Sequence, residues 1–145
     1  MDEKTYSIPK ICAILRLSVR RARRLFEHEP GVLLFKPPGY ASPDIQVPKE
    51  VLLRVLQRSA VPGLVGSTLQ EWGGLLEGNH QVHKVPELGG RFNIGESKAR
   101  RQFEAEPGVL HLMAPGDKRP AIRVPGWVLQ RVLRRSAVPE PVKSR

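Results

Sequence analysis

Apolar side chains recur at helical spacing in three segments of the first part of the chain, and this pattern predicts three short amphipathic helices. Ser7 and Ser18 precede the first two segments, and a serine hydroxyl in that place accepts a backbone N–H of the first turn. Pro48 precedes the third segment, where a missing N–H costs nothing. The expected buried positions are Ile8, Ile11, Cys12 and Leu15 in the first helix, Val19, Ala22, Leu25 and Phe26 in the second, and Val51, Leu52, Val55 and Leu56 in the third.

The residues between the second and third helices predict a β-hairpin. Glu29-Pro30-Gly31 ends the second helix, and the apolar run 32–35 that follows is typical of a strand. The proline-rich residues 36–43 cannot continue that strand and are expected to form a loop. Ile45-Gln46-Val47 alternates apolar and polar side chains, as a returning strand does. A hairpin that follows two helices joined by a tight turn is typical of a winged helix-turn-helix.

The same pattern occurs twice. Residues 22–33 are ARRLFEHEPGVL and residues 99–110 are ARRQFEAEPGVL, and segments 8–62 and 85–139 align at a constant offset of 77 positions without a gap. About half of the aligned residues are identical, which indicates a duplicated domain. The predicted fold class is α+β, mainly α with small β-hairpin wings. We expect two tandem winged helix-turn-helix domains in residues 1–62 and 81–139, a linker in 63–80 and a disordered tail in 140–145.

The linker admits two interpretations. Its glycines favour a freely jointed segment. However, Ser67-Thr68-Leu69-Gln70 has the form of a capping box, and Leu69, Trp72, Leu75 and Leu76 fit one face of a short helix. Because a tryptophan carries a large apolar surface, we expect Trp72 to pack on one repeat or between the two repeats.

The chain is basic, with a formal net charge of +10 and an isoelectric point of about 10.5. Residues 1–62 carry +5 and residues 81–145 carry +7, whereas the linker carries −2. Two basic repeats on an acidic linker favour a polyanionic partner over a charge that serves solubility alone. A basic but inert surface is the alternative.

Four arginines lie in the second predicted helix, which runs from Ser18 to Glu27. The arginine fork holds guanine O6 and N7, or a phosphate, through two hydrogen bonds, so we expect this helix to enter the major groove of duplex DNA. Lys36 in the wing is placed to contact phosphate. The alternative is a solvated basic face on a structural helix. The DNA-binding residues expected in the first repeat are Ser18, Val19, Arg20, Arg21, Arg23, Arg24 and Lys36.

The second repeat keeps most of the expected buried and turn residues of the first, but the residues expected to contact bases differ. Gly95 replaces the Ser18 cap, Glu96-Ser97-Lys98 replaces Val19-Arg20-Arg21, and the wing loop becomes more basic. We expect the repeats to bind different base sequences, or only the first to contact bases while the second contacts backbone. If both bind one face, their half-sites lie about one helical turn, ~34 Å, apart. The DNA-binding residues expected in the second repeat are Ser97, Lys98, Arg100, Arg101, Lys118 and Arg119.

Residues 6–33, with Ser18, Arg24, Phe26-Glu27 and Gly31-Val32-Leu33, resemble the recognition helix and wing entry of the excisionase and MerR superfamily of winged helix-turn-helix proteins. The resemblance covers each repeat almost completely. It implies a DNA-binding module used in transcription control or in directing site-specific recombination. MerR-type regulators continue into a long dimerisation helix and an effector domain, which these residues lack, and excisionases usually carry one module where this chain has two.

The sequence contains no constellation typical of catalysis. The aspartates Asp2, Asp44 and Asp117 pair with no histidine motif, and His80 and His83 have no third metal ligand beside them. A single cysteine excludes an intrachain disulfide and a Cys-based zinc site. We therefore expect a protein that is not an enzyme, with no catalytic residue, no metal and no cofactor.

Other partner classes are weighed against duplex DNA. Single-strand RNA binding needs exposed aromatic side chains, and Phe26 and Phe103 are expected to be buried. The main alternative is a protein-interaction adaptor in which repeat 2 docks a partner protein and only repeat 1 contacts nucleic acid. The protein partners considered are a recombinase, a polymerase and a second copy of the chain.

Localisation follows from two expectations. No apolar run approaches ~18 residues, so we expect no membrane span. The N-terminal residues are acidic and polar, unlike a secretory signal, so a cytoplasmic, nucleoid-associated protein is expected. The expected function is duplex DNA binding as a transcriptional regulator or as an excisionase-like architectural or recombination factor.

Overall fold

The structure is a computed structural model that describes residues 4–39, 41, 43–63, 67–78 and 80–137. These residues form seven helices and two three-stranded antiparallel sheets, which confirms the predicted α+β class. The tail predicted in residues 140–145 lies outside the described residues. Within the described part of the chain, no helix combines the length and the apolarity that crossing a membrane requires.

The two repeats have the same order of elements. The first contains β1 (Thr5–Ser7), α1 (Ile8–Leu15), α2 (Val19–Phe26), β2 (Leu33–Phe35), β3 (Asp44–Pro48) and α3 (Lys49–Ser59). The second contains β4 (Val82–Lys84), α5 (Val85–Arg91), α6 (Glu96–Phe103), β5 (Leu110–Leu112), β6 (Ala121–Pro125) and α7 (Gly126–Ser136). The sheet orders are β1-β3-β2 and β4-β6-β5, so the returning strand of each hairpin is central.

The first strand of each sheet was not predicted. Ser7 was expected only to precede the first helix, but it ends the strand β1, in which Tyr6 is fully buried and pairs with Val47. Ser7 ends that strand and also caps α1, because its hydroxyl accepts the backbone N–H of Lys10. A strand of three residues is too short to show alternation, so the sequence pattern displayed only the helix that follows it.

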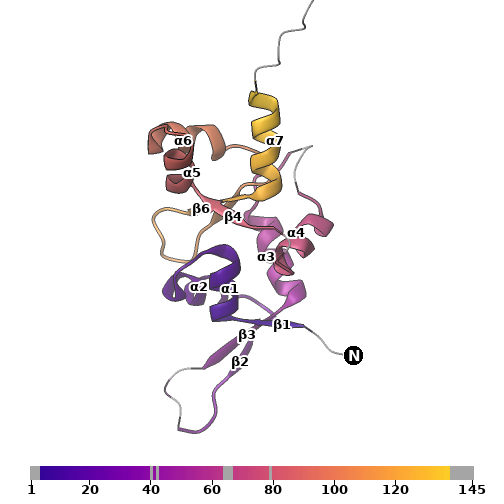
Figure 1. The fold of residues 1–145 in the computed structure, drawn as a ribbon. Helices are drawn as coiled ribbons and strands as arrows, with labels where there is room; N and C mark the ends of the chain where they lie inside the picture. Colours follow the sequence, from indigo (N-terminus) through magenta and orange to yellow (C-terminus); the bar gives the residue numbers. More distant parts are fainter. Residues whose placement is uncertain (1–3, 40, 42, 64–66, 79, 138–145) are drawn as a thin grey trace, which may run out of the picture.

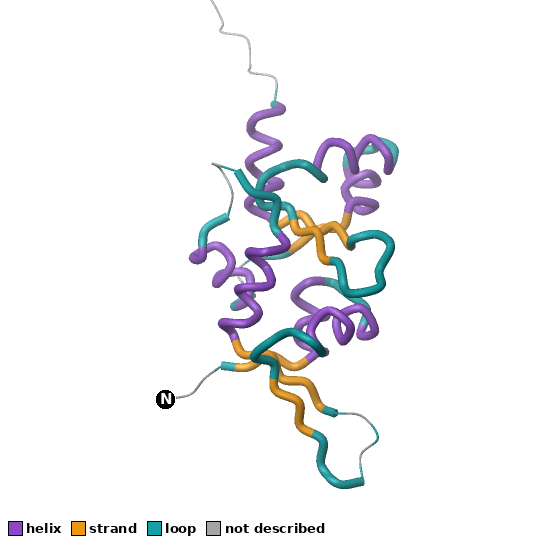
Figure 2. Tube along the Cα trace, turned by 180° about the vertical axis from the view of Figure 1, so that it is seen from behind, coloured by secondary structure: helices purple, strands orange, loops and turns teal. Residues whose placement is uncertain are grey.

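The repeats are stacked one on the other (Figure 1). The helix pairs α1–α2 and α5–α6 lie on one side of the stack, and α3 and α7 lie on the other. The view from behind shows the loop that joins β5 to β6 between the two helix pairs (Figure 2). The β2–β3 hairpin of the first repeat lies at the opposite end of the molecule from α7.

The stack has a continuous core at the junction between the repeats. Leu110, Leu112 and Ala114 come from repeat 2 but belong to the apolar cluster built around Phe26 and Leu52 of repeat 1. All five side chains are almost completely buried. The strand β5 therefore pairs with β6 in the sheet of its own repeat, while its leucine side chains pack in the core of the other repeat.

The linker contains a helix, α4 (Leu69–Leu76), so the helical interpretation is confirmed. Its capping box is formed by Thr68 and Glu71, one residue later than the box expected at Ser67. Trp72 is buried and its ring meets the Trp127 ring edge to face at 5.1 Å, as expected for a side chain between the two repeats. The Trp127 indole N–H donates to the Ser67 hydroxyl at 2.6 Å.

Candidate nucleic-acid interface

The helix α2 begins where the sequence predicts, but Val19, which was expected on its buried side, is 55% exposed because it lies in the outward-facing first turn. The Ser18 hydroxyl accepts the backbone N–H of Arg21 at 3.2 Å and caps the helix. Ala22, Leu25 and Phe26 are buried against the rest of the repeat. Burial of that side turns the first turn outward, so that Ser18, Val19 and Arg20 are all exposed.

Two of the arginines expected to contact DNA are held by the other repeat. The Asp117 carboxylate in the β5–β6 loop lies 2.7 Å from Arg24 Nη2 and 3.8 Å from Arg21 Nε. Arg24 also donates to the carbonyl of Pro115 at 3.0 Å. The Asp117 side chain is only 5% exposed and accepts the backbone N–H of Ala114. The wing of repeat 2 therefore holds the Asp117 carboxylate in a fixed position against the arginines of α2.

The remaining candidates of repeat 1 lie near its own hairpin. Arg23 is half-buried, and its guanidinium donates to the carbonyl of Pro43 at 3.4 Å, at the start of β3. Lys36 is exposed directly after β2. The structure therefore separates the exposed Arg20 and Lys36 from three arginines that already have partners within the protein.

The helix α6 presents a less basic surface. Its N-cap is Gly95, as predicted, and Ser97, Lys98 and Arg101 are exposed. Arg100 is half-buried and forms an ion pair with Glu104 at 3.4 Å, one turn further along the helix. Lys118 and Arg119 are exposed on the wing loop whose Asp117 contacts α2.

An open cleft of about 840 Å³ lies between the repeats and is lined by both helices. Ser18 and Arg21 reach it from α2, and Glu96 and Arg100 reach it from α6. The charged side chains along it are five cations and one carboxylate: Arg16, Arg21, Lys84, Arg100, Arg123 and Glu96. Three of these cations, Arg16, Arg21 and Arg100, also form ion pairs with carboxylates outside the lining, so the positive field that favours an anion is smaller than the count suggests.

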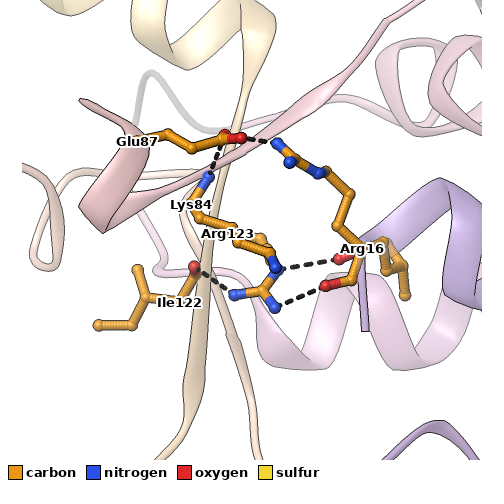
Figure 3. A network of polar contacts seen from close by, with 6 residues as sticks. Arg16, Lys84, Glu87, Ile122 and Arg123 are labelled. Atoms are coloured by element: carbon orange, nitrogen blue, oxygen red, sulfur yellow. Dashed lines mark hydrogen bonds and ion pairs between the residues drawn. The ribbon is translucent and has the colours of Figure 1, made fainter. Parts of the chain in front are cut away.

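A polar joint holds the two sides of the cleft together (Figure 3). The Arg123 guanidinium donates to the carbonyls of Leu15 and Arg16, at 2.9 and 2.7 Å, where α1 ends. Arg16 itself adopts a left-handed conformation with φ 55°, which turns these carbonyls out of the helix. Burial lowers the pKa of Arg123 to about 10, so this side chain is still charged at neutral pH.

The same joint contains an ion pair between Arg16 and Glu87 (Figure 3). Glu87 also accepts the backbone N–H of Lys84 at 3.1 Å. The hydrogen bond from Arg16 lowers the pKa of Glu87 to about 2, and the Lys84 N–H contributes in the same direction. The contacts of Arg123 and Arg16 across the joint were not expected from the sequence, because they join segments that are far apart in the chain.

A second feature missed from the sequence occurs in both repeats. Arg54 and Arg58 form ion pairs with Glu29 at 2.9 and 2.8 Å. In repeat 2 the residues 77 positions later do the same, with Arg135 lying 2.6 Å from Glu106. The Glu29 and Glu106 carboxylates are nearly buried. Each of these carboxylate–arginine clusters, called clamps below, connects the turn after α2 or α6 to the last helix of its repeat. The identity of these charged positions at the constant offset was the signal that could have revealed the clamps.

No protein-family model matches the chain, and neither the search of curated proteins nor the search of solved structures found a match. The described residues bring together no group of three histidine, cysteine, aspartate or glutamate side chains suited to a metal ion.

Proposed function

We propose that the protein binds duplex DNA through two tandem winged helix-turn-helix repeats, as a transcriptional regulator or an excisionase-like architectural or recombination factor. The observation that carries this proposal is the set of exposed cations on the two helices and their wings: Arg20, Lys36, Lys98, Arg101, Lys118 and Arg119. Side chains of α2 and α6 also meet at the cleft between them. A phosphate backbone is the polyanion that such a basic surface fits.

The exposed and the held cations take different roles in this proposal. Arg20 is exposed at the start of α2 and is the side chain best placed to contact a base edge in the major groove. Lys36, Lys98, Arg101, Lys118 and Arg119 are exposed and contact phosphates. Arg21 and Arg24 share the Asp117 carboxylate, which reduces the positive potential that they offer to DNA. Asp117 thus positions α2 at the expense of some electrostatic attraction.

The spacing of the DNA site follows from the stack. The first turns of α2 and α6 line a single cleft, so we expect the two helices to bind adjoining segments of one site. This replaces the half-site spacing of one helical turn, ~34 Å, that applies to separately docked helices. It also makes the two binding events mutually dependent, because the joint fixes one helix relative to the other.

Fluorescence anisotropy with a labelled duplex tests the proposal. Arg20→Ala is expected to reduce the preference for specific over random duplex by about 1–3 kcal/mol, the worth of one bidentate base contact. Arg101→Ala is expected to weaken binding to every duplex and to reduce the salt dependence by about one released counterion. Arg134→Ala is the matched control, because Arg134 is exposed on α7, away from the helix pairs.

The controls decide the result. Unchanged binding by Arg134→Ala together with loss by the other two variants supports the proposed face. Equal losses in all three variants contradict it, because charge alone and not position would then govern binding. Absence of duplex binding by the wild-type protein at low salt removes the proposal.

The alternative function, an adaptor in which repeat 2 docks a partner protein, meets a constraint in this arrangement. The strand β5 and the part of the repeat 2 wing around Pro115 and Asp117 are engaged by repeat 1, so these surfaces are not open to a partner. The large exposed apolar strand belongs instead to repeat 1, where Leu33, Leu34 and Phe35 form β2.

A further inference from the structure

The strand β2 has an open edge, whereas the equivalent edge of β5 is closed by the chain itself. Ala60 forms an antiparallel bridge with Leu110, and the Val61 N–H donates to the Val109 carbonyl at 2.9 Å. The backbone that follows α3 therefore pairs with the outer edge of β5. In repeat 1 the strand order β1-β3-β2 places β2 at the edge of its sheet, and among the described residues its only pairing partner is β3.

The open edge carries three consecutive apolar side chains. Leu33, Leu34 and Phe35 of β2 are 42, 52 and 51% exposed, whereas Leu110 and Leu112 of β5 are fully buried. Exposed apolar residues on an edge strand favour pairing with another strand. The β2–β3 hairpin extends beyond the other described elements in both views (Figure 1 and Figure 2), so a second chain has room beside it.

Leu34 presents the backbone groups that such a pairing needs. Along an antiparallel strand, alternate residues direct their N–H and C=O groups to opposite sides of the strand. Val109 directs its carbonyl outward from β5, because it accepts the Val61 N–H, and its equivalent in repeat 1 is Val32. Two residues further along, Leu34 therefore directs its N–H and C=O away from β3.

The strand β2 is complementary to itself in the antiparallel direction. When Leu34 lies opposite Leu34 of a second copy, Phe35 lies opposite Leu33 of that copy, and the reverse pair also forms. Apolar side chains in direct cross-strand contact stabilise a sheet. Lys36 is the only charged residue of the segment and lies opposite Val32 of the copy. The two lysines are then about 13 Å apart along the strand, beyond the screening length of about 10 Å in 0.1 M salt.

Among the described strands, only β2 combines an open edge with exposed large apolar side chains. The strand in this protein that matches it is therefore β2 of another molecule. We propose that β2 pairs with β2 of a second copy of the chain across a two-fold axis at Leu34, which joins two three-stranded sheets into one of six strands. The contact is isologous, so it uses the same edge of both chains and closes at two.

The length of the strand limits the strength of this contact. Pro37 and Pro38 follow Lys36, and neither has an N–H to donate to a partner strand. The pairing is therefore confined to the few residues before them. Association is expected to be reversible and to depend on protein concentration, and it does not require DNA.

Analytical ultracentrifugation of the full chain tests this proposal. The mass of the wild-type protein is expected to rise with concentration from one chain of 16.2 kDa to two chains and to stop there. Leu34→Pro removes the outward N–H, which β3 does not use, and a proline with that orientation is tolerated on an edge strand. This variant is expected to remain a single chain at every concentration.

A pair of charged variants tests the two-fold axis itself. Leu34→Lys and Leu34→Glu each place two like charges opposite one another, so each variant alone is expected to remain a single chain. An equimolar mixture is expected to regain a complex of two chains, because the charges that then face each other are opposite. Recovery in the mixture also shows that both variants fold. A head-to-tail contact does not bring residue 34 against itself and gives no such recovery.

Leu69→Asp is the matched control, because Leu69 is 58% exposed on α4 and lies outside β2. It is expected to associate as the wild type does. The two-fold contact is overturned by a wild-type protein that stays a single chain, by a mass that grows past two chains, or by a mixture of Leu34→Lys and Leu34→Glu that does not pair. Loss of association in Leu69→Asp also overturns it.

Discussion

Leu33 and Leu110 are the same residue in the same place of two copies of one repeat, yet Leu33 is 42% exposed and Leu110 is fully buried. Both begin the first strand of a hairpin, and both pair with the returning strand of their own sheet. The difference comes from the neighbouring repeat, which covers β5 and leaves β2 open. Duplication here produced one fold with two environments, so the repeats are distinguished by position in the stack as well as by sequence.

Removing the side chain at this pair of positions should give the largest difference between the repeats. Leu110→Ala is expected to lower the free energy of unfolding by about 2–5 kcal/mol, because it leaves a cavity in a closed core. Leu33→Ala is expected to lower it by at most about 1 kcal/mol, since that residue is already 42% exposed and leaves no closed cavity. Urea denaturation at low protein concentration, where chains are separate, measures both. Equal losses would mean that repeat 1 does not cover β5 in solution.

The charged clamps should behave alike in both repeats. Glu29→Gln and Glu106→Gln each replace a nearly buried carboxylate that binds two arginines, and each is expected to cost about 1–2 kcal/mol of folding free energy. Hydrogen bonds from Arg58 lower the pKa of Glu29, so its contribution is present above the ordinary pKa and is lost as pH falls through the lower folded value. Glu77→Gln, at an exposed residue, is the control. A large effect in one repeat only would show that the clamps are not equivalent.

The joint between the repeats should give the smallest effect, and the size of that effect depends on pH. The pKa of Glu87 falls from 4.5 to about 2, so its ion pair with Arg16 stabilises the protein fully above about pH 4.5 and progressively less as pH falls toward 2. Both side chains are 39% exposed, which limits the contribution through solvent screening. The difference in unfolding free energy between wild type and Glu87→Gln should shrink below pH 4.5. A difference that stays constant with pH would exclude this pair as its source.

Local features of the fold could be predicted from the sequence, because they depend on residues close together in the chain. Ser18 before an apolar stripe gave the start of α2, and Pro48 gave the start of α3. Contacts between the repeats could not be predicted in this way. Arg24 meets the loop around Asp117, and Arg123 meets the carbonyl of Leu15, and neither pair has any periodic relation in the sequence.

The candidate interface was predictable only in outline. An arginine-rich helix with a serine cap could be recognised, but the sequence does not distinguish Arg20, which is exposed, from Arg21 and Arg24, which an aspartate of the other repeat holds. That aspartate stands where the first repeat has a different residue, so the duplication itself gave no signal. The duplication did give a signal for the clamp around Glu29, because Glu29, Arg54 and Arg58 are all identical in the second repeat, 77 positions later.

The salt dependence of duplex affinity tests the central proposal most directly. If Lys36, Lys98, Arg101, Lys118 and Arg119 each contact one phosphate, the logarithm of the association constant should fall linearly with the logarithm of salt concentration, with a slope of about −4.5. The measurement uses wild-type protein and one labelled duplex, at protein concentrations where chains remain separate. A steep negative slope near this value is the predicted result. A slope near zero, or no binding at low salt, would contradict the proposed DNA interface.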